Sequence, residues 1–279
     1  MAVFKDIRNG RLYVGDNVEV LRTIPDGVID LTVTSPPYDN LRDYKGYSFD
    51  FESLAAELYR VTKDGGVVVW NVSDATVKGS ETCTSFRQAI HFVDSCGFKL
   101  HDTMIWQKPS FSAIGALRVR YAPVFEYMFV FVKGKLRTFN PICDRLNKTV
   151  GTIKRASSLR QINGNIRESI SKHVGEVRPE YGQRFNVWHI SPNSMASRKH
   201  GHPAMFPIAI PRDHILSWSN SGDCVLDPFM GSGTTACAAI ETGRRWVGCE
   251  ISLAYADKAV DRITNHVERT QNITPKETE

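Results

Sequence analysis

The chain has 279 residues, of which 42% are hydrophobic and 23% charged, a balance typical of a soluble globular protein with one or two domains. It lacks an apolar run of bilayer length and the apolar core of a signal peptide, and its six cysteines form no Cys-x-x-Cys pair, which argues against a disulfide framework or a zinc site. We therefore expect a cytoplasmic protein with reduced thiols, and its net charge of +5 is distributed unevenly.

Strand-like and helix-like segments alternate along most of the chain. The predicted strands are 11–16 (at a sheet edge), 28–34, 67–70, 101–107, 124–132, 185–190, 223–227 and 245–250. The predicted helices are 17–24, 51–58, 86–96, 207–218, 234–241 and 253–267. Gly65-Gly66 is expected to form the turn before the strand 67–70, and 101–107 is expected to pair with 124–132 in antiparallel fashion. Residues 39–48 are expected to form an exposed loop that can close over a substrate.

The chain is organised around the turn Thr34-Ser35-Pro36-Pro37-Tyr38, which follows a buried strand. The two prolines end that strand, because neither can donate a hydrogen bond to a sheet. The turn thus presents a hydroxyl, carbonyl oxygens and an aromatic ring where ligands bind in open α/β sheets. An exocyclic base amine is a poor nucleophile, and acceptors such as the Ser35 oxygen and the Pro36 carbonyl can free its lone pair. Tyr38 can stack on a base that has left the duplex, although a turn of this kind alone is most often only a turn.

Positive charge is concentrated between residues 133 and 200, which hold 14 Lys and Arg against 4 Asp and Glu, a local net charge of +10. The rest of the chain holds 21 basic and 26 acidic residues, so a basic segment sits on an acidic body. This pattern favours a polyanionic partner, and a solvated insert is the alternative. The candidate residues for contact with such a partner, here and in two loops, are Arg42, Lys45, Arg118, Arg120, Arg145, Lys148, Lys154, Arg155, Arg160 and Arg167.

A second motif, Val225 to Thr235, reads as a strand, a glycine-rich turn and a helix start. Its glycines permit close approach of a ligand, and the helix N-terminus suits an anionic group. The next strand ends at Glu250, whose carboxylate can accept the hydroxyls of a ribose. The same spacing fits a dinucleotide site, so a nicotinamide oxidoreductase is an alternative on this motif alone. A dehydrogenase has no use for the Ser35 turn, whereas an amine methyltransferase needs both motifs.

The two motifs together resemble the S-adenosylmethionine-dependent DNA amino-methyltransferases, in the beta-group order with the catalytic turn first. The resemblance extends to Gly15-Asp16, Gly65-Gly66 and His202-Pro203-Ala-x-Phe206-Pro207, and it covers residues 10 to 265 except for the basic segment. It implies a Rossmann-like α/β methyltransferase domain with a mostly parallel sheet and a small basic target-recognition module. The implied division is 1–133 and 191–270 for the two halves of the domain, 134–190 for target recognition and 271–279 for a tail.

The resemblance also implies site residues. Ser35, Pro36, Pro37 and Tyr38 would act on the target base. The implied S-adenosyl-L-methionine site comprises Asp16, Thr34, His202, Pro203, Phe206, Asp227, Pro228, Phe229, Gly231, Ser232, Gly233, Thr234 and Glu250. Two histidines, His200 and His202, do not by themselves make a metal site, and the chemistry needs no metal.

We therefore predict a site-specific methyltransferase acting on double-stranded DNA at the exocyclic N4 of a flipped-out cytosine. Within the family, Ser at position 35 is more typical of N4-cytosine enzymes and Asp of N6-adenine enzymes, so N6-adenine is the alternative. A catalytically silent DNA-binding protein of the same fold is a more distant alternative. The resemblance is compatible with a cognate restriction endonuclease as partner, and with a monomer or a homodimer.

Overall fold

A computed structural model of the protein describes residues 4–37, 49–109, 117–155, 158–160, 163–168, 174–192 and 206–273. The chain divides into a large unit, residues 1–140 and 186–279, and a small unit, residues 141–185. The small unit lies within the region 134–190 that the sequence assigned to target recognition. Among the described residues, no helix is both long enough and apolar enough to cross a bilayer.

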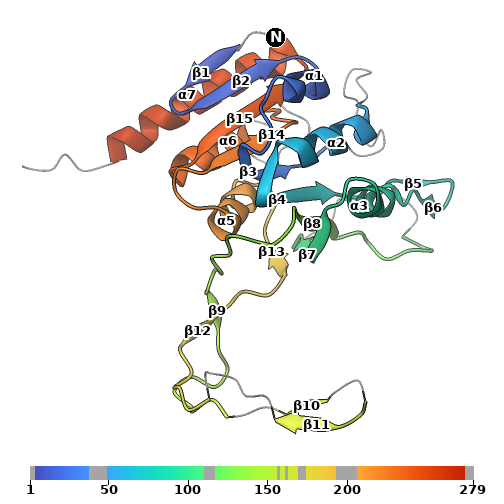
Figure 1. The fold of residues 1–279 in the computed structure, drawn as a ribbon, viewed down its shortest axis with the longest axis vertical. Helices are drawn as coiled ribbons and strands as arrows, with labels where there is room; N and C mark the ends of the chain where they lie inside the picture. Colours follow the sequence, from blue (N-terminus) through green and yellow to red (C-terminus); the bar gives the residue numbers. More distant parts are fainter. Residues whose placement is uncertain are drawn as a thin grey trace, which may run out of the picture. The chain divides into compact units, whose positions relative to one another are not determined.

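One twisted sheet forms the centre of the large unit (Figure 1). Its strands, in spatial order, are β1 (Lys5–Ile7), β2 (Gly10–Val14), β15 (Arg245–Glu250), β14 (Cys224–Asp227), β3 (Ile29–Thr34), β4 (Thr62–Val72), β8 (Phe125–Val132), β7 (Lys99–Gln107) and β13 (Val187–His189). The five strands from β2 to β4 are mutually parallel, while β8 runs antiparallel to both β4 and β7. The fold is thus the Rossmann-like, mostly parallel α/β fold that the sequence predicted.

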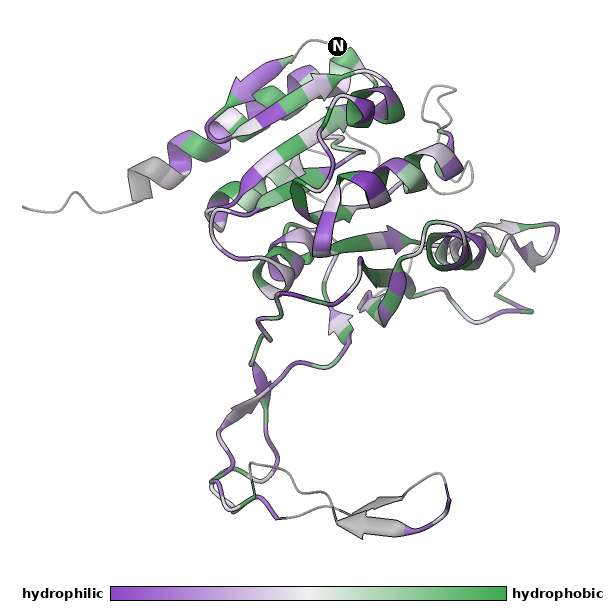
Figure 2. Cartoon of the chain, viewed as in Figure 1, coloured by the Kyte–Doolittle hydropathy of each residue, from purple (hydrophilic) through white to green (hydrophobic). Residues whose placement is uncertain are grey.

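Helices cover both faces of this sheet. Leu21 of α1 (Asn17–Arg22), Leu54 of α2 (Phe51–Val61) and Phe92 of α3 (Thr84–Asp94) pack on one face. The opposite face is covered by α5 (Ala209–Trp218), α6 (Thr234–Glu241) and α7 (Leu253–Ile273). Apolar and polar residues are interspersed along α2, as the mixed colours of that helix in Figure 2 show. Only one side of the helix is buried, so its apolar residues recur with the helical period.

The connections reverse direction in the middle of the parallel strands. From β14 the chain crosses through α6 to β15 on one side, and from β3 it crosses through α2 to β4 on the other. The two crossover helices lie on opposite faces of the sheet. A reversal of this kind leaves a crevice at the carboxyl ends of the two strands, which is where open α/β sheets bind ligands. Here the crevice lies between the ends of β3 and β14.

Most predicted elements differ from the structure by a few residues at their ends, and three differ in more than that. Residues 11–16 were expected at a sheet edge, but β2 lies inside the sheet because β1, which has a weak sequence signal, pairs with its outer side. Gly65-Gly66 lies within β4 and not before it, since the register against β3 shifts there and a bulge absorbs the extra residues. The closing helix extends past the expected end at 267 to Ile273.

Short antiparallel pairs make up the small unit. Its strands are β9 (Arg145–Leu146) with β12 (Tyr181–Gly182), and β10 (Ser158–Arg160) with β11 (Ile166–Glu168). A single bridge joins Ile153 to Val177 between these pairs. Strands this short bury few side chains. The sequence of the small unit therefore has only weak apolar periodicity.

Candidate active site at the carboxyl edge of the sheet

The predicted functional residues gather at one edge of the sheet. We call it the carboxyl edge, because the parallel strands β2, β15, β14, β3 and β4 all end there. Asp16 follows β2, Ser35 follows β3, Asp227 ends β14 and Glu250 ends β15. Residues separated by more than 200 positions in the sequence are thereby brought to one edge of the parallel sheet.

Asp227 ties the two sides of the crevice together. Its Oδ1 accepts hydrogen bonds from the Thr34 hydroxyl at 2.7 Å and from the Phe229 backbone N–H at 3.0 Å. Its Oδ2 accepts one from the Thr235 hydroxyl at 2.6 Å. The side chain is buried, and that burial raises the pKa of the Asp227 carboxyl although the three donors oppose the shift.

This network includes two predicted cofactor residues. Thr34 and Asp227 are both buried and bonded to each other. The bond crosses from β3 to β14, directly before Ser35 and directly before the glycine-rich loop. Their side chains therefore fix the turn at Ser35 relative to that loop, because a buried hydrogen bond to a carboxylate permits little movement.

The loop between β14 and α6 needs its glycines. Gly231 and Gly233 have φ angles of +52° and +80°, values that residues with a side chain rarely adopt. A Cβ on Gly233 would also lie 2.9 Å from the Ile263 side chain of α7. The Gly231 N–H donates to Glu250 Oε2 at 2.8 Å, so the loop and the end of β15 are joined directly.

Glu250 keeps the capacity to bind a ligand. Its Oε1 accepts a hydrogen bond from the Ser252 N–H at 2.9 Å, and a carboxylate oxygen that accepts one hydrogen bond can accept a second. Burial raises the pKa of the Glu250 carboxyl, and the backbone N–H groups of Ser252, Gly231 and Ile251 oppose that shift. An acceptor fixed in this way beside a glycine-rich loop suits the hydroxyls of a ribose.

Arg262 is a site residue that the sequence analysis missed. Its Nη1 donates to the Ser232 carbonyl at 3.1 Å, to the Ser232 hydroxyl at 2.9 Å and to the Thr234 hydroxyl at 2.9 Å. Burial lowers the pKa of its guanidinium. Arg262 thus reaches from α7 to hold the glycine-rich loop, and a charged residue facing the core side of an amphipathic helix is the only sequence signal that could have found it.

The other predicted residues of this edge are placed as follows. Ser35 is half-buried, Pro36 is buried and Pro37 is half-buried directly after β3. Asp16 caps α1, since its Oδ1 accepts from the Val18 N–H at 2.9 Å and the Glu19 N–H at 3.1 Å. Pro228 is buried, Phe229 is half-buried, and Phe206 packs on the core at the approach to α5. The predicted residues Tyr38, Arg42, Lys45, His202 and Pro203 lie outside the described part of the chain.

The predicted DNA-binding residues fall into two groups. Arg118 and Arg120 lie in the large unit, in the loop between β7 and β8. The members of the other group all lie in the small unit: Arg145, Lys148, Lys154, Arg155, Arg160 and Arg167. Arg145 packs over the Phe185 ring at 4.5 Å, and Lys154 pairs with Glu176 at 2.9 Å. Among the described residues, no cluster of His, Cys, Asp and Glu has the form of a metal site.

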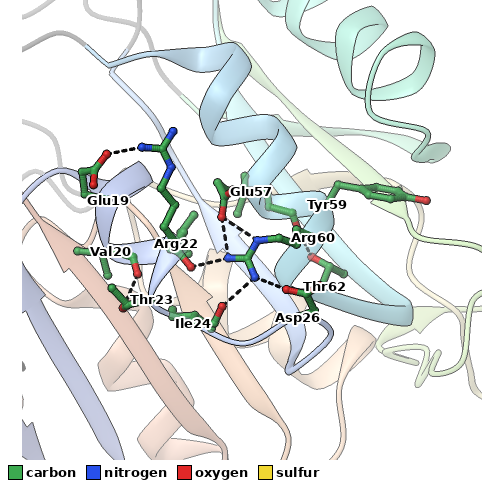
Figure 3. Close-up of polar contacts among 12 residues, drawn as sticks. Glu19, Val20, Arg22, Thr23, Ile24, Asp26, Glu57, Tyr59, Arg60 and Thr62 are labelled. Atoms are coloured by element: carbon green, nitrogen blue, oxygen red, sulfur yellow. Dashed lines mark hydrogen bonds and ion pairs between the residues drawn. The ribbon is translucent and has the colours of Figure 1, made fainter. Parts of the chain in front are cut away.

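A cleft of about 670 Å³ lies at the opposite, amino edge of the sheet, away from these residues. Figure 3 shows the contacts beside it, where Arg60 bonds to Asp26 and to Glu57. Arg60 also donates to the Leu21 carbonyl at 2.7 Å, and Lys133 donates to the Tyr59 carbonyl at 2.8 Å. These cations of the cleft thus hold α1, α2 and β8 together, so we assign the cleft to the framework and not to the active site.

Comparison with known proteins identifies the family of the chain. A family model described as DNA methylase matches residues 29–261. The orphan methyltransferase M.BamHII of Bacillus amyloliquefaciens is 51% identical over 249 residues, covering 88% of this chain and 92% of that protein. The type II methyltransferase M.PvuII of Proteus hauseri is 26% identical, covering 95% of this chain and 87% of that protein.

Solved structures share the fold. The PvuII DNA methyltransferase (cytosine-N4-specific) superposes over 97% of both chains with a TM-score of 0.65 at 22% identity. TTHA0409 of Thermus thermophilus, complexed with S-adenosyl-L-methionine, superposes over 92% of this chain and 93% of its own with a TM-score of 0.62 at 26% identity. The chain therefore belongs to the S-adenosylmethionine-dependent DNA amino-methyltransferases, in the beta group whose catalytic turn precedes the cofactor loop.

Proposed function

We propose that this methyltransferase modifies the exocyclic N4 of cytosine in double-stranded DNA, at a specific sequence. The observation that carries the proposal is Ser35, which the bond between Thr34 and Asp227 holds at the crevice between β3 and β14. The N4-cytosine specificity in the name of the PvuII enzyme, which has the same fold, supports the choice of base.

The residues at the carboxyl edge fit S-adenosyl-L-methionine. Glu250 offers acceptors to the ribose, while the glycine-rich loop has no side chains at Gly231 and Gly233 to block a close approach. The first turn of α6 and the Arg262 guanidinium carry positive charge at the glycine-rich loop and would suit the carboxylate of the cofactor. Phe229 offers a half-buried ring, and Asp16, Thr34 and Asp227 hold the backbone around the predicted cofactor site, of which they stay predicted members.

The bound cofactor supplies the methyl group in an activated form, on a sulfonium. Ser35 and the Pro36 carbonyl accept hydrogen bonds from the target amine, which frees its lone pair for attack on the methyl carbon. Tyr38 stacks on the flipped base and holds it in line. As the carbon–nitrogen bond forms, the methyl carbon would separate from the sulfur of the cofactor. The resulting cationic amine is strongly acidic and passes its proton to water, so no strong base is required of the chain.

Nucleoside mass spectrometry of DNA incubated with the protein and isotopically labelled S-adenosyl-L-methionine tests the choice of base. Label in N4-methylcytosine supports the proposal. Label in N6-methyladenine would overturn the choice of cytosine while keeping the site and the mechanism, because both bases carry an exocyclic amine. Sequencing the modified DNA then identifies the recognition site.

The variant Ser35→Ala tests the role of the turn. We expect it to bind S-adenosyl-L-methionine as the wild type does and to lose about 100-fold or more in single-turnover rate, the scale of one lost polarising contact. Ser221→Ala is the matched control, because this exposed serine lies between α5 and β14 at the amino edge. An unchanged rate in Ser35→Ala would remove this serine from the mechanism.

A further inference from the structure

The loop that joins β7 to β8 projects beyond the carboxyl edge. Val72, the last residue of β4, pairs with Tyr127 of β8, so the residues before Phe125 extend past the end of β4. Figure 1 shows this loop beside the hairpin formed by β5 (Thr76–Val77) and β6 (Ser80–Glu81). The loop therefore leaves the sheet at the edge that carries Ser35, two strands away in the sheet order.

Residues 117–121 of this loop, Leu-Arg-Val-Arg-Tyr, form what we call the 117–121 segment. Its apolar side chains face solvent: Leu117 is 45% exposed, Val119 is 79% exposed and Tyr121 is fully exposed. Its arginines alternate with them. Exposed apolar side chains alternate here with cations, at the active edge of a protein that acts on DNA. This pattern fits a DNA duplex, which has phosphates on its outside and stacked bases inside.

The segment is held in place by polar contacts at both its tip and its base. At the tip, Arg120 bonds to the Gly79 carbonyl of the β5–β6 hairpin and lies 3.8 Å from Glu81. At the base, the Lys108 N–H donates to the Val124 carbonyl at 2.7 Å. The Lys108 ammonium also lies 2.6 Å from the buried carboxylate of Glu126. These contacts join Arg120 to the β5–β6 hairpin and close the loop between β7 and β8, while the Tyr121 side chain is fully exposed.

We propose that the 117–121 segment enters the duplex as the target base leaves it, and that Tyr121 stacks on the bases that border the gap. Flipping a base out breaks its pairing and stacking, and proteins that unstack DNA commonly insert apolar side chains at the opened step. An aromatic ring restores part of the lost stacking without sequence preference. This inference rests on the proposed attack on a flipped-out base and names the residue that stabilises the open duplex.

The test compares two duplexes that contain the identified recognition site. In one the target base is normally paired, and in the other it lies opposite an abasic site, so that less pairing and stacking must be broken. We expect Tyr121→Ala to lower the single-turnover methylation rate on the paired duplex about ten- to hundredfold, the scale of one base–aromatic stack. On the abasic duplex we expect a loss of less than about threefold. Tyr121→Phe and Tyr121→Trp should retain most of the rate on both.

Leu100→Ala is the control, because Leu100 is 43% exposed near the other end of β7. An equal loss on the two duplexes would overturn the proposal and leave Tyr121 a general contact or a structural residue. A change in sedimentation from dimer to monomer with Tyr121→Ala would assign the surface to self-association instead. Because the target is whichever base carries the label, a finding of N6-methyladenine would overturn the choice of cytosine without affecting this test.

Discussion

The carboxyl edge of the large unit and the small unit are stabilised in different ways. At the edge, buried polar groups such as Asp227 and Glu250 bond to the backbone and hydroxyls of neighbouring elements. The small unit has strands of two or three residues, and solvent-exposed pairs such as Arg184 with Asp144 and Lys154 with Glu176 lie outside those strands. Exposed ion pairs contribute little to stability. The edge therefore tolerates little change, whereas the small unit can change its surface without loss of the fold.

The largest effect is expected from Asp227→Ala. The change removes an acceptor from three donors, of which the Thr34 and Thr235 hydroxyls are buried. We expect the free energy of unfolding to fall by about 3 kcal/mol, since hydrogen bonds to a charged group are worth about 1.5–3 kcal/mol each and are not additive. Methylation should become undetectable. Urea unfolding and calorimetric titration with S-adenosyl-L-methionine measure the two losses, and wild-type cofactor binding would contradict the role given to this carboxylate.

Removing positive charge from the small unit is expected to weaken DNA binding and to leave the stability of the fold unchanged. Changing Lys148, Arg155 and Arg160 together to Gln should leave the urea midpoint within error, because the fold of the large unit does not depend on them. DNA binding should weaken, and the slope of log K against log salt should decrease by about 3, since each phosphate contact contributes about 0.9.

A matched triple variant controls for the loss of net charge. Lys5, Arg8 and Arg269 are exposed residues of the large unit that lie off the carboxyl edge. Changing them to Gln alters the net charge equally and should leave the salt slope nearly unaltered. Equal slopes in the two triple variants would place the DNA contact outside the small unit.

An intermediate effect, on cofactor affinity, is expected at Arg262, which reaches from α7 to the glycine-rich loop. Arg262→Met keeps the length of the side chain and removes its three described hydrogen bonds to the loop. We expect the dissociation constant for S-adenosyl-L-methionine to rise about tenfold, which corresponds to about 1.4 kcal/mol. The exposed Arg269 lies on the same helix, and Arg269→Met should bind the cofactor normally. An unchanged affinity in Arg262→Met would make the residue purely structural.

The sequence predicted most of the framework because its signals are local. Apolar runs identified the parallel strands, and the turns after β3 and β14 identified the crevice, because each turn directly follows its strand in the chain. What it did not predict depends on contacts between distant elements. The pairing of β1 with β2, the bond from Thr34 to Asp227 across 193 positions and the reach of Arg262 to Ser232 leave no periodic signal. A carboxylate that supports the backbone looks the same in a sequence as one that binds a ligand.

The strands of the small unit could not be predicted from the sequence either. Its charge balance set it apart, yet charge alone does not define its strands, because β9 to β12 pair through backbone groups that every residue has. Its boundaries at 141 and 185 lie inside the predicted 134–190. The difference arises because residues such as Asn140 bond to the large unit, where its amide donates to the Ser219 carbonyl at 3.2 Å.

The smallest effect that we expect is a change in how the free energy of unfolding depends on pH. A buried and an exposed carboxylate can be compared directly in this way. Burial raises the pKa of Asp227 in the folded state, so its contribution is most favourable below its unfolded pKa of about 4 and is lost as the pH rises through the folded value. Asn at this position can still accept from Phe229 and Thr34, and it does not ionise. The stability of Asp227→Asn relative to the wild type should therefore increase as the pH rises from 4 toward neutrality.

Asp50 provides the opposite case at the start of α2. Its Oδ2 accepts from the Ser53 hydroxyl at 2.5 Å, and this bond, with the Ser53 N–H, lowers the pKa of Asp50 below its ordinary value. Its stabilisation is present above the unfolded pKa and is lost as the pH falls through the folded one. The stability of Asp50→Asn relative to the wild type should thus decrease as the pH rises, and urea unfolding from pH 4 to 8 measures both variants. If the Asp227→Asn difference also decreased with pH, the three donors around Asp227 would outweigh its burial, and its ionised form would be the one that the edge is built to hold.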